Sequence, residues 1–169
     1  MPINISQLRR LVSMSGGQPN IVIVDKCCLV RYNKTRLTDM LQALCKKFKL
    51  RKADITIQIT DNAGIKKVNR RFLNTSKNTD VISFDLSDTL DKTRTFDIIV
   101  NSELAKTHAK KLGHSAENEL TLYILHGFLH NVGFDDLTDA DARQMHRMED
   151  KLLHKLGYGT VYAVTGERK

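Results

Sequence analysis

The chain lacks features that define several other classes of protein. It has only three cysteines, with Cys27 next to Cys28 and Cys45 alone, so it predicts neither a disulfide framework nor a zinc ribbon. No apolar stretch approaches the length of a membrane span, and the first residues contain no apolar core followed by a cleavage signal. Repeats and low-complexity segments are also missing. We therefore expect a cytoplasmic protein in a reducing compartment, without a membrane partner.

Acidic residues are in short supply as well. Lysine and arginine number 27 against 19 aspartates and glutamates, which gives a net charge of +8 and a pI near 9.5. Such an excess points to polyanionic partners, with nucleic acid as the leading candidate. The basic residues are spread over several segments and form no long tail, so each cluster can equally well be a solvated helix face. One such cluster is Lys66, Lys67, Arg70 and Arg71.

The length of 169 residues suits one domain with its own core. Residues 1–19 end in MSGGQPN and are expected to form a weakly ordered arm, with residues 20–169 as the domain. Runs rich in β-branched residues predict strands at 21–25, 55–60, 81–86 and 95–100, the last two close enough for a hairpin. Apolar residues at helical spacing predict helices at 35–49, 62–72, 103–112, 116–132 and 139–156. This order predicts one α+β domain with a mixed four-stranded sheet covered by about five α-helices.

Polar residues and glycines mark the helix ends. Ser102 and Ser115 are suitable N-caps for the third and fourth helices. Thr138, with Asp141 three residues later, resembles a capping box at the start of the last helix. Glycines that can adopt the left-handed conformation are expected where helices stop, at Gly113, Gly133 and Gly157.

The most informative segment is HGFLHNVGFDD, residues 126–136. His126 and His130 are four residues apart, so a helix places both imidazoles on one face. Gly133 lets the chain turn back at the helix end, which brings Asp136 into position as a third ligand. Three protein ligands leave coordination open for water, as in catalytic zinc sites. The segment therefore predicts one metal ion per chain, although two histidines and a carboxylate also suit iron.

Two other interpretations of this segment remain open. Histidines four residues apart also occur on half-buried helix faces, and Asp136 can instead cap the following helix. The extended zinc-protease motif has the same spacing, but it requires a glutamate beside the first histidine as general base. Here that position is Gly127, which disfavours a conventional metalloprotease.

Three segments occur in the order TDVISF (residues 79–84), HGFLH (126–130) and MHRMED (145–150). Together they make the chain, from about Asp54 to Gly157, similar to the YbeY family of metal-dependent endoribonucleases. The resemblance implies the fold predicted above, a zinc ion, and hydrolysis of single-stranded RNA in the maturation and quality control of ribosomal RNA. It implies ribosomal RNA or the small ribosomal subunit as partner. Candidate RNA contacts are Lys66, Lys67, Arg70 and Arg71.

The chain departs from the commonest pattern of this family at three positions. The third histidine ligand is replaced by Asp136, which leaves metal binding intact. An arginine that contacts RNA or a reacting phosphate aligns with Leu73, which puts the strength of the nuclease activity in doubt. The glycine expected before Asp97 is Phe96.

The chemistry implied by the resemblance is metal-assisted phosphodiester hydrolysis, with the ion at His126, His130 and Asp136. Asp135 is a candidate general base, although a role in the turn is favoured. Asp80 and Ser83 are implied to lie near the cleft, but they can equally well hydrogen-bond the loop before their strand. The remaining histidines lie outside any ligand spacing and are expected on the surface or on helix faces: His108, His114, His146 and His154.

Two alternative functions remain. A metal-dependent peptidase or amidohydrolase can use the same three ligands, but Gly127 and the basic composition argue against it. A ribosome-associated RNA-binding factor with a structural zinc and weak catalysis is the second alternative, which Leu73 keeps open.

Overall fold

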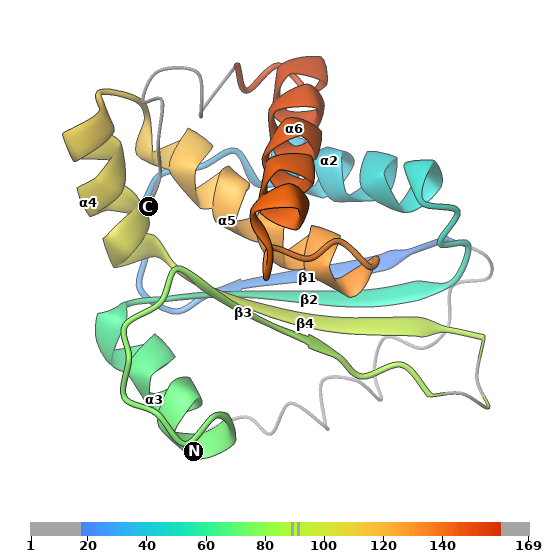
Figure 1. Cartoon of the computed structure of the whole chain (residues 1–169), viewed down its shortest axis with the longest axis horizontal. Helices are drawn as coiled ribbons and strands as arrows, with labels where there is room; N and C mark the ends of the chain where they lie inside the picture. Colours follow the sequence, from blue (N-terminus) through green and yellow to red (C-terminus); the bar gives the residue numbers. More distant parts are fainter. Residues whose placement is uncertain (1–17, 89, 91, 160–169) are drawn as a thin grey trace.

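The computed structural model describes residues 18–88, 90 and 92–159 (Figure 1). Its strands are β1 (Asn20–Asp25), β2 (Ala53–Thr60), β3 (Val81–Asp85) and β4 (Arg94–Asn101). Its helices are α2 (Lys34–Lys47), α3 (Asn62–Phe72), α4 (Ser102–Leu112), α5 (Ala116–Asn131) and α6 (Asp139–Lys155). The expected strands and helices are confirmed, with ends shifted by one or two residues. The arm expected at residues 1–19 lies outside the described residues, except for its last two.

The four strands form one mixed sheet in the order β1-β2-β4-β3. β1 pairs with β2 and β2 with β4 in parallel, whereas β3 runs antiparallel to β4, with Ser83 opposite Ile98. The hairpin expected from the sequence is therefore confirmed. Among the described strands β3 pairs only with β4, so it is the edge strand next to the histidine-bearing helix α5, which contacts both β3 and β4.

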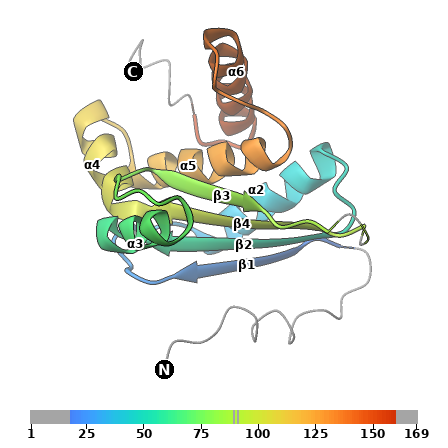
Figure 2. The same cartoon turned by 60° about the horizontal axis from the view of Figure 1, so that its bottom comes forward.

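The two faces of the sheet are covered differently. Ile55, Ile57 and Ile59 of β2 alternate with polar residues and point into the main core, which α2 and α5 complete. Figure 2 shows α2, α5 and α6 on one side of the sheet. α3 lies on the other side, where it contacts β2, β3 and β4, and the buried Ile82 and Ile99 face it outside the main core. The sheet thus separates α3 from α5.

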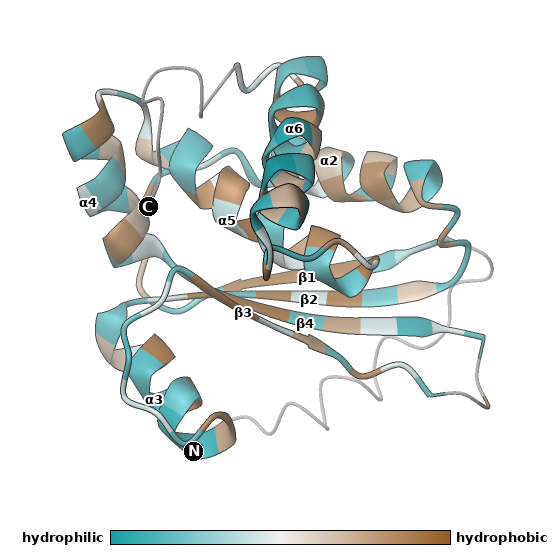
Figure 3. Cartoon of the chain, in the orientation of Figure 1, coloured by the Kyte–Doolittle hydropathy of each residue, from teal (hydrophilic) through white to brown (hydrophobic). Residues whose placement is uncertain are grey.

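α5 is the central helix of the fold. It is buried on nearly every side, because β3 and β4 contact one face and α4 and α6 contact others. Phe128 of α5 packs its ring against Phe48 and Phe96, at centroid distances of 5.9 and 6.0 Å. Figure 3 shows that α6, which lies over α5, is mainly hydrophilic on its visible side. Side chains on α5 are therefore held by packing from several directions.

Most of the predicted helix ends are confirmed. Ser115 caps α5, and Thr138 caps α6 with its hydroxyl accepting from the backbone N–H of Asp141 at 3.2 Å. Gly113, Gly133 and Gly157 all adopt positive φ angles. The prediction for α4 was wrong by one residue, because the cap is Asn101 and its side-chain oxygen accepts from the N–H of Leu104 at 3.1 Å.

Where α4 packs on α5, Glu119 is fully buried beside two histidines. His114 Nε2 lies 3.1 Å from its Oε2, and His108 Nδ1 lies 3.7 Å from its Oε1. His114 follows the end of α4 and its side chain is only 12 % exposed, so the expectation of a place on the surface or on a helix face was wrong for this residue. A buried carboxylate needs polar partners, and both imidazoles lie within ion-pair distance of this one. Within the described residues, no helix has the length and apolar character needed to cross a membrane.

Candidate metal centre

Helix α5 and the segment after it bring His126, His130 and Asp136 to one point. The Nε2 atoms of the two histidines lie 3.0 Å apart, with the rings nearly perpendicular at 80°. Asp136 places one carboxylate oxygen 3.6 Å from His126 Nε2 and the other 3.8 Å from His130 Nε2. Among the described residues, this is the one group of three such side chains whose donor atoms come within 4.8 Å of one another.

The second ring nitrogen of each histidine already has a partner. His126 Nδ1 lies 2.7 Å from Glu149 Oε1, and His130 Nδ1 lies 3.1 Å from the carbonyl oxygen of Phe134. A carboxylate and a carbonyl oxygen only accept hydrogen bonds, so each Nδ1 is the nitrogen that donates. The two Nε2 lone pairs then face each other at 3.0 Å, an arrangement that calls for a cation between them.

A proton is the simplest cation that can occupy this position. Burial lowers the pKa of His126, but the hydrogen bond and charge of Glu149, together with the charges of Asp80 and Asp136, outweigh burial and raise the pKa above its ordinary value. A protonated His126 can donate from Nε2 to His130. A metal ion bound at the same place would therefore have to displace this proton.

The spacing of the donor atoms fits a metal ion. With zinc–nitrogen and zinc–oxygen bonds of about 2.0–2.2 Å, ligands at the corners of a tetrahedron lie roughly 3.3–3.6 Å apart. The observed separations of 3.0, 3.6 and 3.8 Å surround this range, so small side-chain movements suffice to hold such an ion. Two imidazoles and one carboxylate suit zinc and also iron, and three protein ligands leave room for water.

Gly127, where a zinc protease has its glutamate, faces the sheet. A Cβ atom placed on Gly127 would lie 2.9 Å from methyl carbons of both Val81 and Ile98 and 3.5 Å from Ser83 Cβ. Real Cβ atoms do not approach side chains this closely, so any side chain at this position would force α5 and the two strands to shift. A glutamate at this position would have to enter the contact between α5 and the strands β3 and β4.

Asp80 lies close to His126, and Ser83 lies close to Gly127, the next residue of α5. Asp80 is close enough for its charge to help raise the pKa of His126, and Ser83 lies below Gly127 on the face of β3 turned toward α5. Asp80 also accepts from the backbone N–H of Val81 at 2.8 Å and from the Thr79 hydroxyl at 3.0 Å. Its carboxylate thus fixes the start of β3 while its charge acts on His126.

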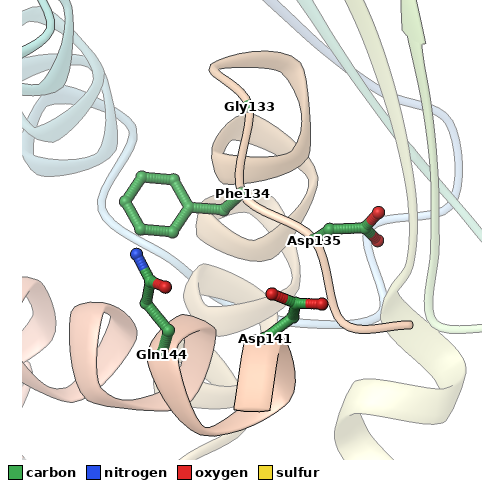
Figure 4. Close-up of a pocket in the computed structure, with 5 residues that line it drawn as sticks. All are labelled: Gly133, Phe134, Asp135, Asp141 and Gln144. Atoms are coloured by element: carbon green, nitrogen blue, oxygen red, sulfur yellow. The ribbon is translucent and has the colours of Figure 1, made fainter. Parts of the chain in front are cut away.

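Asp135, the candidate general base, is exposed, and its Oδ1 accepts from the backbone N–H of Asp136 at 2.8 Å. It also lines a small pocket of about 140 Å³ beside the ligand segment. Figure 4 shows Gly133, Phe134 and Asp135 on the segment leaving α5, with Asp141 and Gln144 of α6 facing them. The hydrogen bond to Asp136 fits the turn interpretation of Asp135.

The candidate RNA contacts lie away from the metal ligands. Lys66, Lys67, Arg70 and Arg71 are on α3, across the sheet from α5. Leu73, at the position of the family arginine, is the C-cap residue of α3 and is 53 % exposed, so it is not part of the core. Phe96, at the family's glycine position, is fully buried below Phe128.

Two residues that hold the segments around the metal centre in place were not predicted from the sequence. Glu149 on α6 is fully buried and holds His126, and a charged residue among the apolar positions Met145 and Leu152 was a usable signal for it. Arg94 donates to Asp85 and to the carbonyl oxygen of Asn131, both at 2.8 Å. It thereby ties the β3–β4 hairpin to the last turn of α5, and no spacing rule predicts a contact over 37 residues.

The sequence and the fold both match those of known proteins. The family model described as "Endoribonuclease YbeY" matches residues 27–157. Proteins named endoribonuclease YbeY from Staphylococcus aureus strains JH9 and Newman are each 37% identical over 114 residues, which cover 62% of this chain and 74% of the relative. The solution structure of TM1509 from Thermotoga maritima shares the fold, with a TM-score of 0.57 and 21% identity over 80% of this chain and 88% of that one. The chain therefore belongs to the YbeY family of endoribonucleases.

Proposed function

We propose that this protein is a zinc-dependent endoribonuclease that cleaves single-stranded ribosomal RNA in the cytoplasm, during maturation and quality control of the ribosome. One zinc ion per chain is held by His126, His130 and Asp136. The observation that carries the proposal is the pair of Nε2 atoms 3.0 Å apart, each on a ring whose Nδ1 is already engaged. Membership of an endoribonuclease family and the net charge of +8 support RNA as substrate.

Zinc bound there would lower the pKa of a water molecule and polarise a phosphoryl oxygen. The residues of the chain provide the fixed frame for this chemistry. Glu149 and the Phe134 carbonyl group orient the two imidazoles and keep both Nε2 atoms available. The Asp136 side chain is 42 % exposed, so this side of the centre is open to a substrate chain.

Asp80 and Ser83 are proposed to line the substrate cleft at the edge strand β3. The Ser83 hydroxyl group can donate a hydrogen bond to a phosphate oxygen, and Asp80 keeps the start of β3 in place through the N–H of Val81. Asp135 remains the candidate proton acceptor, since it adjoins the ligand Asp136 and is exposed to solvent.

The two alternatives are less well supported. A peptidase lacks a general base at Gly127, where the contacts with Val81 and Ile98 leave no space for a side chain. A factor with a purely structural zinc is at odds with the exposure of the ligands, because structural zinc sites use four protein ligands in a closed shell. Here the described side chains supply three, and that of His130 is 30 % exposed.

Three assays on one purified preparation test the proposal. We expect about one zinc per chain, cleavage of a single-stranded RNA that stops with chelator and returns with added zinc, and no hydrolysis of a casein-type peptide substrate. Cleavage that continues unchanged after complete removal of metal would refute the zinc-dependent mechanism. RNA binding with normal metal content but no cleavage would instead support the structural-zinc alternative.

A further inference from the structure

Two aromatic rings and an arginine lie together on the surface formed by α3 and β3. Phe72, the last residue of α3, is 58 % exposed, and its ring centroid lies 5.4 Å from that of Phe84 on β3. The guanidinium carbon of Arg71 lies 5.3 Å from the centre of the Phe72 ring. In Figure 3 the hydrophobic colour reappears at this end of α3, after a mainly hydrophilic stretch. We call Phe72, Phe84 and Arg71 the Phe72–Phe84 surface.

The surroundings of this surface are cationic. Lys66, Lys67, Arg70 and Arg71 all lie on α3, and the last two occupy its final turn. In the part of the chain that the structure describes, none of the four forms an ion pair with a carboxylate, whereas Arg94 pairs with Asp85. Basic residues in a last turn stabilise a helix through its dipole. That effect does not account for an exposed phenylalanine beside them.

The edge strand β3 connects this surface to the metal centre. Successive residues of a strand point to opposite faces, so Ser83 faces Gly127 of α5 while Phe84 faces α3. β3 pairs only with β4, which leaves its outer edge open among the described residues. A flexible chain that passes over this edge can therefore touch Phe84 on one side and approach His126 on the other.

We propose that the Phe72–Phe84 surface is a platform on which unpaired bases of the single-stranded RNA substrate stack. Exposed aromatic rings next to cations are the combination with which proteins hold single strands, because every base has a flat π-face and every nucleotide a phosphate. Bases inside a duplex do not expose these faces, so the platform selects unpaired RNA. The proposal rests on the proposed function and adds to it the site that receives the bases.

Binding of a labelled single-stranded RNA to the full chain tests the platform, with chelator present so that the RNA stays intact. Phe72→Ala should weaken binding by about 5- to 150-fold, the range that loss of one stacked base produces. Phe72→Leu should weaken it almost as much, because it keeps apolar area but has no ring, whereas Phe72→Trp should bind at least as well as the natural protein. Leu90→Ala is the matched control, since Leu90 is 93 % exposed between β3 and β4 and should not affect binding.

Two further measurements distinguish base stacking at Phe72 from a purely electrostatic contact: the salt dependence of RNA affinity, and binding of an RNA in which one nucleotide lacks its base. Phe72→Ala should leave the slope of log affinity against log salt concentration unchanged. Arg71→Ala should reduce the size of this slope by about 1, the amount that loss of one phosphate contact produces. An RNA with an abasic nucleotide at the stacked position should bind the natural protein and Phe72→Ala equally. The stacking proposal would be overturned if Phe72→Leu bound the RNA as tightly as the natural protein, whether or not Phe72→Ala did so too. A natural protein that neither binds nor cleaves RNA would instead overturn the proposed function.

Discussion

The metal centre and the Phe72–Phe84 surface are built in opposite ways. At the centre both histidine ligands are held by a second group, and the side chains of His126 and His130 are only 18 % and 30 % exposed. At the surface Phe72 is 58 % exposed and the cations of α3 are unpaired in the described part of the chain. Coordination of a metal demands fixed geometry, whereas contact with a single strand tolerates variation. Substitutions should therefore act sharply at the centre and gradually at the surface.

The largest effect is expected from His130→Ala. Two remaining ligands hold a metal poorly, so metal content and RNA cleavage should both fall to background. Metal analysis and a cleavage assay on the same preparation provide the measurement. His154→Ala, which removes an exposed histidine from the end of α6, is the matched control and should behave like the natural protein.

Asp136→His sharpens this test of the centre. Imidazole binds zinc as well as carboxylate does, so the variant should retain metal. Complete loss of metal would show that the segment after α5 accepts only the shorter side chain. Full metal occupancy in His130→Ala would remove His130 from the ligand set.

A large loss of stability is expected from side chains at Gly127. A Cβ atom there meets Val81 and Ile98 at 2.9 Å, so Gly127→Ala should cost about 1–3 kcal/mol of unfolding free energy through overpacking. Gly127→Glu, which restores the zinc-protease glutamate, should destabilise further and gain no peptidase activity. Denaturant titration and a peptidase assay provide the measurements. A stable Gly127→Glu variant with peptidase activity would instead favour the peptidase alternative over the nuclease.

A smaller effect at the centre is expected from Glu149→Gln. Loss of the partner that orients a ligand commonly lowers metal affinity by about 10–100-fold, and Gln can still accept the hydrogen bond, so the lower end is expected. Competition titration with a coloured chelator measures this affinity. Unchanged metal affinity would mean that Glu149 contributes only to packing and does not orient His126.

The pH dependence of the same variant follows from the raised pKa of His126. In metal-free protein the charged imidazole stabilises the folded state at low pH, and this contribution is lost as the pH rises through the folded-state pKa. Metal requires the neutral ring, so zinc affinity should fall as the pH drops through the same value, with release of a proton on binding. Glu149→Gln removes the main charge that raises this pKa and should move both changes to lower pH. An unmoved affinity profile would contradict the role given to Glu149.

The smallest effect is expected from Leu73→Arg at the surface. The exposure of Leu73 means that the variant should fold and bind zinc normally. One added charge-assisted contact with a phosphate should speed cleavage of single-stranded RNA by about tenfold. Cleavage kinetics measure this, and Leu73→Gln, polar but uncharged, is the control. Unchanged cleavage in a folded Leu73→Arg variant would show that the missing family arginine does not limit this enzyme.

The features that could be predicted from the sequence depend on local patterns. Helical spacing located His126 and His130 on one face, and cap residues such as Ser115 and Thr138 predicted where helices begin. These features depend on residues a few positions apart. The run from Val81, rich in β-branched residues, likewise predicted β3, because strand propensity is also a local property.

The features that could not be predicted from the sequence depend on contacts between distant segments. Glu149 reaches His126 over 23 residues, and its position depends on how α6 lies over α5. Phe72 continues the helical spacing of the apolar residues Ile65 and Val68, a pattern that is typical of a buried helix face. In the structure its ring packs against Phe84 of the edge strand β3 and remains 58 % exposed. The strand order β1-β2-β4-β3 also follows from long-range pairing that no local pattern specifies.

Titration of metal-stripped protein with zinc, while cleavage of a single-stranded RNA is followed, tests most directly whether His126, His130 and Asp136 form the catalytic centre. We predict that activity rises in proportion to added zinc and levels off at one ion per chain. His130→Ala should remain inactive throughout the titration. Cleavage by the stripped protein at the full rate, or restoration of full activity to His130→Ala by one equivalent of zinc, would contradict the assignment of this centre.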